Sequence, residues 1–152
     1  MIRIELAHTF PVSTGDAFAY ITDTRHWAEF FPNFVRLHDA ANAKWNTPGD
    51  QVTAVIRLLG REVEVNMTLE QYQRDRMVTY VSRQEGLPDA WHERHFKAVP
   101  DGFEFRPVVA FAPRSGLAGL FDRFLLRRAV AGALRQTIGN LESVFKQRRS
   151  GA

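Results

Sequence analysis

Cysteine is absent from the 152 residues of this sequence, which excludes disulfide bonds, thiolate metal sites and cysteine nucleophiles. No run approaches the roughly 18 consecutive apolar residues of a membrane-spanning helix. The N-terminus alternates between apolar and polar residues and lacks the apolar block of a secretory signal peptide. Metal-ligand spacings, nucleotide-binding glycine loops and Ser-His-Asp sets are also missing. We therefore expect a cytoplasmic protein that uses no metal and no other cofactor.

The composition is that of a globular protein with a phenylalanine-rich interior. Hydrophobic residues make up 45% and charged residues 24%, both ordinary proportions, whereas phenylalanine alone contributes 12 residues. A chain of this length forms one core more readily than two. We expect a single ligand-binding domain over residues 1–147 and a basic, flexible tail over residues 148–152.

The net charge of +3 is concentrated in the last third of the chain. A basic helix can contact a membrane surface or nucleic acid, but a solvated polar face is the simpler interpretation. No zinc-finger, RNA-recognition or P-loop pattern accompanies these charges, so we expect no nucleic-acid partner. Peripheral membrane contact through the basic helix is kept as an alternative, as are a monomer and a homodimer. The basic residues are Arg123, Arg127, Arg128, Arg135, Lys146, Arg148 and Arg149.

Period-two alternation predicts strands, and turn residues separate them. The first strand covers residues 2–10. Two short helices follow, the first capped at Ser13 and the second ending before Pro32. The later strands are predicted over residues 34–41, 51–58, 63–70, 77–84, 91–98 and 103–111, with reversals at 48–50, 59–61, 74–76, 86–89 and 100–102.

The last third predicts one amphipathic helix over residues 115–147. Arg127 and several small residues interrupt its apolar side, so we expect the helix to cover a hollow rather than a fully packed core. Gly132 would leave room for a ligand there, and Gly139 would allow close packing against the sheet. The apolar side comprises Leu120, Phe124, Ala131, Leu134, Ile138, Leu141 and Phe145.

An antiparallel sheet must bury one face, and this helix is the only element long enough to cover it. Its roughly 30 residues span about 45 Å. The order of elements therefore predicts an α+β helix-grip fold. In this fold a curved antiparallel sheet of about seven strands wraps around the long C-terminal helix, and two short helices follow the first strand.

Several segments support this fold by their order and spacing. They are Phe18–Asp23, Trp27, Phe30–Val35, Pro48–Asp50, His95–Gly102 and the helix over 113–141. Together they resemble the START / polyketide-cyclase superfamily, the birch-pollen-allergen-like helix-grip proteins often labelled SRPBCC. The resemblance implies one cavity between sheet and C-terminal helix for an apolar or amphipathic molecule such as a lipid, sterol, polyketide, quinone or hormone. A minority of members do chemistry on their ligands, and the family has no universal catalytic motif.

The segment His92-Glu93-Arg94-His95 is the densest polar cluster. Its histidines are three apart in a predicted strand, so the cluster is not the zincin motif, which needs histidines four apart on a helix. Strand alternation predicts His92, Arg94 and Phe96 facing inward. Glu93, His95 and Lys97 would face solvent.

An inward Arg94 needs a carboxylate, a ligand anion or water, because an unpaired buried cation is costly. Arg94 and Arg127 could together hold the anionic end of an apolar ligand through their guanidinium groups. Alternatively, both arginines reach water at the cavity mouth or pair with Glu142 or Asp122.

His92 is the candidate general acid or base, because an ordinary imidazole titrates near neutrality. No carboxylate is placed to orient its ring, so we favour a binding protein over an enzyme. If the protein is an enzyme, we expect a metal-free polyketide aromatase or cyclase activity in the same cavity. A membrane-associated quinone or lipid chaperone is the third hypothesis.

The remaining candidate ligand-binding residues are apolar. Trp27 and Phe31 are expected either to gate the cavity mouth with the loop at 86–88 or simply to pack on the sheet edge. The predicted cavity walls are Val65, Met67, Phe96, Phe105, Phe111, Phe124, Ala131 and Leu134. Broad selectivity for the apolar tail and sharper selectivity for the polar head would follow.

Overall fold

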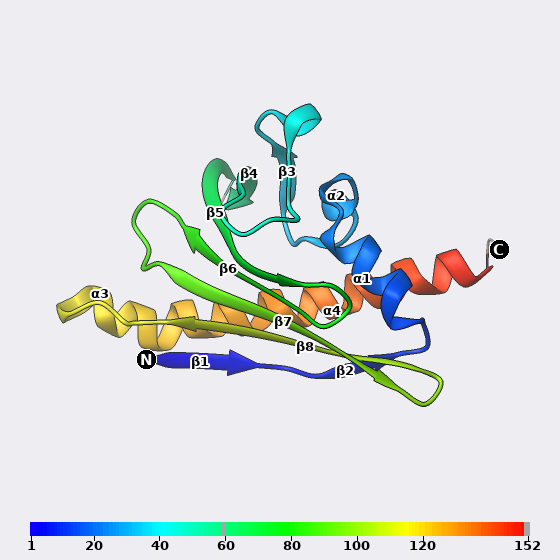
Figure 1. Ribbon diagram of the computed structural model, residues 1–152. Coiled ribbons are helices and arrows are strands. Elements are labelled where there is room, and N and C mark those ends of the chain that lie inside the picture. Colours follow the sequence, from blue (N-terminus) through cyan, green and yellow to red (C-terminus); the bar gives the residue numbers. More distant parts are fainter. Residues whose placement is uncertain (59, 151–152) are drawn as a thin grey trace.

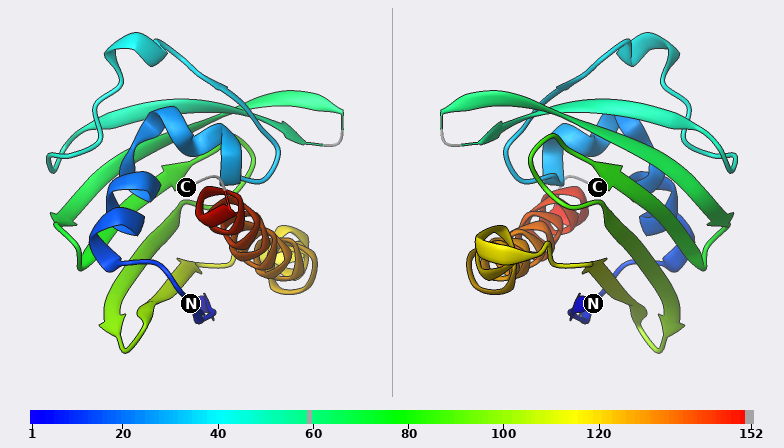
Figure 2. Two further views of the ribbon diagram at one scale, coloured as in Figure 1. Left: turned by 90° about the vertical axis from the view of Figure 1, so that its right-hand side faces the viewer. Right: turned by 90° about the vertical axis from the view of Figure 1, so that its left-hand side faces the viewer.

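The structure, a computed structural model, describes residues 1–58 and 60–150. An antiparallel sheet with the order β1-β8-β7-β6-β5-β4-β3, in which β2 also pairs with β8, curves around one long helix (Figures 1 and 2). This arrangement confirms the predicted helix-grip fold. The strands are β1 (Ile2–Glu5), β2 (His8–Phe10), β3 (Phe34–Leu37), β4 (Gln51–Leu58), β5 (Arg61–Gln73), β6 (Met77–Arg83), β7 (Ala90–Val99) and β8 (Gly102–Phe111).

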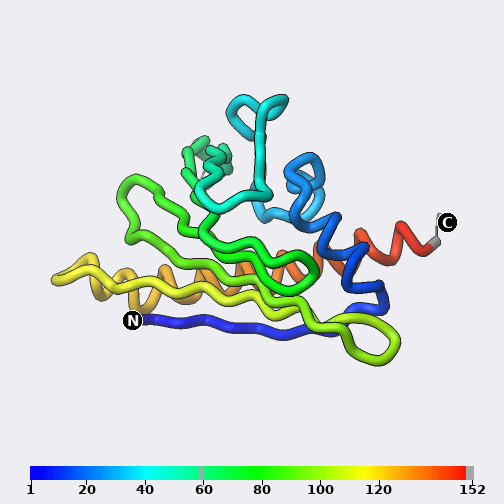
Figure 3. Tube along the Cα trace, viewed as in Figure 1, coloured from blue at the N-terminus to red at the C-terminus, as the bar shows by residue number. Residues whose placement is uncertain are grey.

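The helical elements precede β3 and follow β8, except for the short η2 between β3 and β4 (Figure 3). Ser13 caps α1, since its hydroxyl oxygen accepts from the Asp16 N–H at 3.3 Å. Among the described residues, no helix combines the length and hydropathy that crossing a bilayer requires. The helices are α1 (Thr14–Thr22), η1 (Thr24–His26), α2 (Trp27–Phe30), η2 (Ala40–Asn42), α3 (Gly116–Phe121), the π-helical turn η3 (Asp122–Leu126) and α4 (Arg127–Ser150).

Two predicted strands are shorter than expected. The strand predicted over 2–10 divides into β1 and β2, because Pro107 on the facing β8 has no N–H to donate and only its carbonyl pairs, with Leu6 N–H at 3.2 Å. The strand predicted to reach residue 41 ends at Leu37, where Asp39 takes a left-handed conformation (φ 50°) and leads into η2. The predicted reversal at 59–61 includes Leu59, which lies outside the described residues.

Aromatic side chains form the centre of the core between α1, the sheet and the C-terminal half of α4. Phe145 of α4 packs edge-on against Phe10 of β2 at 5.2 Å between ring centroids and against Phe103 of β8 at 6.3 Å. On β7, Phe96 meets Phe18 of α1 at 5.0 Å. The phenylalanine-rich composition thus fills a packed core at this end of the fold.

The long helix α4 is anchored unevenly. Its closest backbone approaches are to α2, β1 and β2, and Asn140 Nδ2 donates to the Phe30 carbonyl at 3.0 Å. Leu141 is fully buried, whereas Leu134, two turns earlier on the same side, is only half-buried. The C-terminal half therefore packs as a core helix, and the N-terminal half covers the sheet more loosely.

The predicted continuous helix is interrupted, and the prediction for Phe124 is wrong as a result. The π-helical turn η3 adds a residue, which rotates the preceding side chains by about 100° relative to a straight helical projection. Phe124, predicted as a cavity wall, is 69% exposed. Arg127, at the start of α4, is also exposed, which agrees with the alternative that its side chain reaches water.

A buried ion pair fixes this interrupted segment to the sheet. Asp122 is completely buried and accepts from Arg114 N–H at 2.8 Å, Nε at 2.9 Å and Nη2 at 2.7 Å. These hydrogen bonds hold the pKa of the Asp122 carboxyl below its usual range, although burial opposes the shift. Arg114 Nη1 also donates to the Gly86 carbonyl at 2.6 Å, which ties η3 to the loop between β6 and β7.

The C-terminal end of α4 corrects the predicted tail. The helix continues to Ser150, and the Arg148 guanidinium lies 4.4 Å from the centre of the Tyr20 ring. Residue 148 is therefore part of the folded domain rather than the start of a flexible tail, and residues 151–152 lie outside the described part of the chain.

Two helix glycines provide a matched stability test. Gly139→Ala is expected to stabilise the protein by up to about 1 kcal/mol, because alanine is the better helix former and a Cβ there meets nothing within 4 Å. This open space also means that the predicted close packing at Gly139 is wrong. Gly119→Ala should destabilise, since its Cβ would lie 2.0 Å from the Arg114 carbonyl oxygen. Urea denaturation measures both changes, and a destabilised Gly139→Ala would contradict the open environment.

Candidate ligand-binding site

The polar cluster of β7 divides between the two faces of the sheet. On the outer face, Glu93 accepts from Arg3 Nη1 at 3.1 Å and lies 2.8 Å from His95 Nε2. His92 and Arg94 point to the inner face, toward α2 and α4, because each contacts the ring of Tyr80 on the neighbouring strand β6. Phe96, on the same face, is part of the core.

Arg94 lies among aromatic rings from two elements. Its guanidinium carbon is 4.9 Å from the ring centre of Phe31, 5.4 Å from that of Tyr80 and 5.8 Å from that of Phe30. These distances are within the range of cation–π attraction. In residues 1–58 and 60–150, no carboxylate forms an ion pair with Arg94. The side chain is half-buried, so its N–H donors face a partly dehydrated space without a countercharge.

His92 stacks flat on Tyr80, with 4.4 Å between ring centroids and 4° between planes, and its Nε2 lies 2.8 Å from Ser82 Oγ. Burial lowers the pKa of His92 to about 3, and the neighbouring Arg94 cation adds to the effect. The imidazole is therefore neutral at physiological pH.

Three residues at this cluster were missed by sequence analysis. Tyr80 and Ser82 reach it because Tyr80 is the cross-strand partner of His92 and Ser82 follows on the same face. Trp45 packs edge-on against Tyr80 at 5.5 Å. Burial raises the pKa of Tyr80, and Arg94 partly offsets that increase. The alternation of apolar and polar residues along β6 places Tyr80 and Ser82 on one face. That Tyr80 lies opposite His92 could be known only from the register between β6 and β7.

The other predicted site residues fall into two groups. Trp27 is a packing residue rather than a gate, since it is buried and its Nε1 donates to the Ile21 carbonyl at 3.0 Å. The fully packed group also includes Met67, Phe96, Phe105 and Phe111. The half-buried group, which can line a space, is Phe31, Val65, Ala131 and Leu134.

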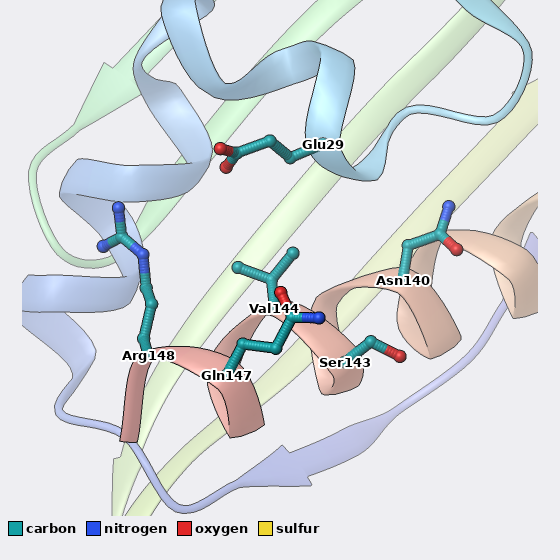
Figure 4. Close-up of a pocket in the computed structure, with 6 residues that line it drawn as sticks. All are labelled: Glu29, Asn140, Ser143, Val144, Gln147 and Arg148. Carbon is teal, nitrogen blue, oxygen red and sulfur yellow. The ribbon is translucent and has the colours of Figure 1, made fainter. Parts of the chain in front are cut away.

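Two surface hollows of about 490 Å³ each flank the C-terminal half of α4. Figure 4 shows the first, with Glu29 of α2 opposite Asn140, Ser143, Val144, Gln147 and Arg148 of α4. The second lies beside Tyr20 and includes Arg148 and Arg149. Neither is lined by His92 or Arg94, and both have open, mixed polar walls. Sites for apolar molecules are enclosed and largely apolar, so neither hollow is a strong candidate for such a ligand.

The described residues do not form a metal centre. In residues 1–58 and 60–150, no three His, Asp or Glu side chains gather as metal ligands would. The ionisable groups of the candidate site are Tyr80, His92 and Arg94. The arrangement can therefore supply one positive charge, a neutral imidazole and hydroxyl groups to a bound molecule.

The lowered pKa of His92 predicts an acid-sensitive stability. Its folded pKa of about 3 lies below the unfolded value, so the unfolded chain takes up the proton first as the pH falls. Stability should decline by roughly 1.4 kcal/mol per pH unit below about pH 6.5. His92→Phe keeps the stacking on Tyr80 and should flatten this decline, measured by urea denaturation. The exposed His38→Phe is the control, and an unchanged slope in His92→Phe would contradict the assignment.

The curved sheet closed by α4 defines a helix-grip protein. Residues 1–146 match the family described as "Polyketide cyclase / dehydrase and lipid transport", and the chain belongs to this family. Membership supports a role in binding a hydrophobic ligand or in cyclase chemistry. No curated protein sequence matches the chain significantly.

Solved structures share the fold at low sequence identity. Protein CV1439 from Chromobacterium violaceum is 15% identical, with a TM-score of 0.73 over 95% of this chain and 97% of its own. The di-domain ARO/CYC StfQ from the steffimycin biosynthetic pathway is 17% identical, with a TM-score of 0.75 over 99% of this chain and 52% of its own. Ara h 8.0201 is 13% identical, with a TM-score of 0.66 over 93% and 98%. At these identities the likeness concerns the fold alone.

Proposed function

We propose that this protein binds an apolar or aromatic small molecule that carries one anionic or electron-rich oxygen, and that Arg94 holds that oxygen. The observation that carries the proposal is the guanidinium of Arg94. It lies on the inner face of the sheet among Phe30, Phe31 and Tyr80, without an ion-pair partner in the described part of the chain. Aromatic rings attract the cation but accept few of its hydrogen bonds.

The chemistry of a guanidinium selects the head of the ligand. Arginine presents planar N–H donors that match a carboxylate bidentately, and charge-assisted hydrogen bonds of this kind are stronger than neutral ones. A carboxylate, enolate or phenolate would supply the countercharge that Arg94 lacks among the described residues, and further acceptors for its N–H groups. The neutral His92 and the Ser82 hydroxyl add hydrogen-bonding groups 2.8 Å apart beside the same ring of Tyr80.

The apolar part of the ligand would lie under the N-terminal half of α4. Half-buried Ala131 and Leu134 supply apolar surface there, and half-buried Val65 packs against the core from β5. A Cβ at Gly132 would meet only the flexible end of Arg135, at 3.9 Å, so the helix leaves space at that turn. Burial of apolar area contributes about 25 cal/mol per Å², and this term depends little on the detailed shape of the tail.

A cyclase is the second candidate, because the family includes such enzymes and Arg94 could equally hold an enolate oxygen. The protonation state of His92 favours a binding protein over a cyclase. An imidazole with a pKa of about 3 is unprotonated near neutrality, so it cannot act as a general acid there, and it is a weak base. Turnover of a polyketide mimic by the wild type, lost in His92→Phe, would establish the enzyme.

The test of the binding proposal compares ligands that differ only at the head. Anilinonaphthalene sulfonate serves as the fluorescent probe, and naphthoic acid competes with it against naphthoic acid methyl ester. We expect the acid to compete at least about tenfold better, since a charge-assisted hydrogen bond contributes roughly 1.5–3 kcal/mol. Equal competition by acid and ester would refute the role assigned to Arg94, and no displacement by either would refute the cavity.

A further inference from the structure

The outward face of α3 and η3 carries a continuous apolar stripe, which we name the α3 stripe. Its side chains recur at intervals of three and four residues and so share one face of the helix. Figure 1 shows this segment at the end of the molecule remote from α1. The stripe consists of Leu117 (85% exposed), Leu120 (49%), Phe121 (41%), Phe124 (69%) and Leu125 (59%).

This orientation is held in place by Asp122, the acidic residue of the segment. Asp122 points inward and is fully buried in its ion pair with Arg114, and Gly119 approaches the Arg114 backbone so closely that a Cβ would clash. The segment therefore presents its acid to the protein, and its leucines and phenylalanines face outward together with Arg123. This reverses the usual arrangement of a surface helix, and exposed apolar patches of this kind mark interaction sites.

The charges around the α3 stripe indicate what covers it. Arg123, Arg127, Arg128 and Arg135 are exposed, and none forms an ion pair in the described part of the chain. The only acid between residues 114 and 135 is the buried Asp122. Leucine and phenylalanine flanked by arginine is the composition of helices that lie in the headgroup region of anionic membranes. A second copy of this chain would bring two sets of arginines together.

We propose that the α3 stripe inserts into the surface of an anionic lipid bilayer and that the flanking arginines contact lipid headgroups. The membrane contact kept as an alternative for the basic helix is thus assigned to α3, η3 and the arginines that flank them. Because Arg114 joins η3 to the Gly86 carbonyl, the docked surface is mechanically linked to the β6–β7 hairpin, whose strands carry Tyr80, His92 and Arg94. The proposal does not depend on which ligand the interior binds.

Vesicle flotation tests the docking. The wild type should float with vesicles of phosphatidylcholine and phosphatidylglycerol. Leu117→Gln/Phe124→Gln should lower binding at least about tenfold, because two large apolar side chains no longer insert. Arg127→Gln/Arg128→Gln should lower binding roughly fivefold per arginine on these vesicles, and binding to phosphatidylcholine alone should be weak throughout. All substituted residues are exposed, so folding is checked simply by an unchanged Tm.

Two control variants distinguish binding through the α3 stripe from nonspecific vesicle binding by exposed apolar or basic residues elsewhere. Leu58→Gln removes an exposed leucine (42%) from β4, and Lys146→Gln/Arg149→Gln removes two charges from the far end of α4. Both should bind vesicles like the wild type. The proposal would be overturned if the wild type did not float with anionic vesicles. It would also be overturned if Leu117→Gln/Phe124→Gln floated as well as the wild type. A lipid-free dimer that the Leu117→Gln/Phe124→Gln variant converts to monomer would overturn it too, since the surface would then belong to a second copy.

Discussion

Arg94→Met is expected to weaken binding of an anionic aromatic probe at least about tenfold without lowering the Tm. The loss follows from removing the guanidinium on the inner face of the sheet, since charge-assisted hydrogen bonds contribute roughly 1.5–3 kcal/mol. Stability should be unchanged or higher, because Arg94 has no ion pair among the described residues. An apolar side chain of similar length removes the cost of dehydrating a charge. Titration of anilinonaphthalene sulfonate and a thermal melt measure the two quantities.

Arg83→Met is the matched control for this substitution. Arg83 lies at the end of β6, is exposed and pairs with Asp89 at 3.3 Å. Its replacement removes the same charge from the same sheet and should leave probe affinity unchanged. If both variants lost affinity equally, the probe would be responding to net charge. A marked fall in Tm for Arg94→Met alone would show instead that the cation–π contacts hold the fold together.

Leu141→Ala and Leu134→Ala are expected to differ strongly, although they are the same substitution two turns apart on α4. Leu141 is fully buried, so its truncation should cost roughly 3–5 kcal/mol of unfolding free energy. Leu134 is half-buried over the looser part of the sheet, and its truncation should cost about 1 kcal/mol. Urea denaturation of the two variants gives both values directly.

This pair tests whether the long helix covers a space at one end and a packed core at the other. Leu134→Ala should also change the affinity for the apolar part of a ligand, and Leu141→Ala should not do so once it is folded. Equal destabilisation by both variants would mean that the interior is packed along the entire helix. The cavity proposed beside Arg94 would then have to be abandoned.

Local patterns in the sequence predicted much of the fold. The strand predicted at 51–58 coincides with β4, and Ser13 caps α1 as its spacing from Asp16 indicated. The facing of His92 and Arg94 also followed from strict alternation along β7, because no bulge interrupts its pairing with β6 or β8. Such features depend only on residues that are close in the chain, so they can be predicted from a single sequence.

Features that depend on tertiary contacts were not predictable in this way. The π-helical turn rotated Phe124 to the outside. It accompanies the pairing of Asp122 with Arg114 and the close approach at Gly119, neither of which a helical periodicity indicates. Tyr80 joined the site only through the register of β6 on β7. The space between α4 and the sheet likewise depends on where the helix is anchored, which no periodicity reveals.

Native mass spectrometry of gently purified wild type and Arg94→Met, with solvent extraction of whatever each carries, tests the central claim most directly. The wild type should retain an apolar or aromatic compound with an acidic or oxygen-bearing end, and Arg94→Met should retain much less of it. Identical adducts on both proteins would contradict the role of Arg94. A clean apo mass for the wild type, without any thermal shift across fatty acids, sterols and aromatic acids, would contradict the binding function itself.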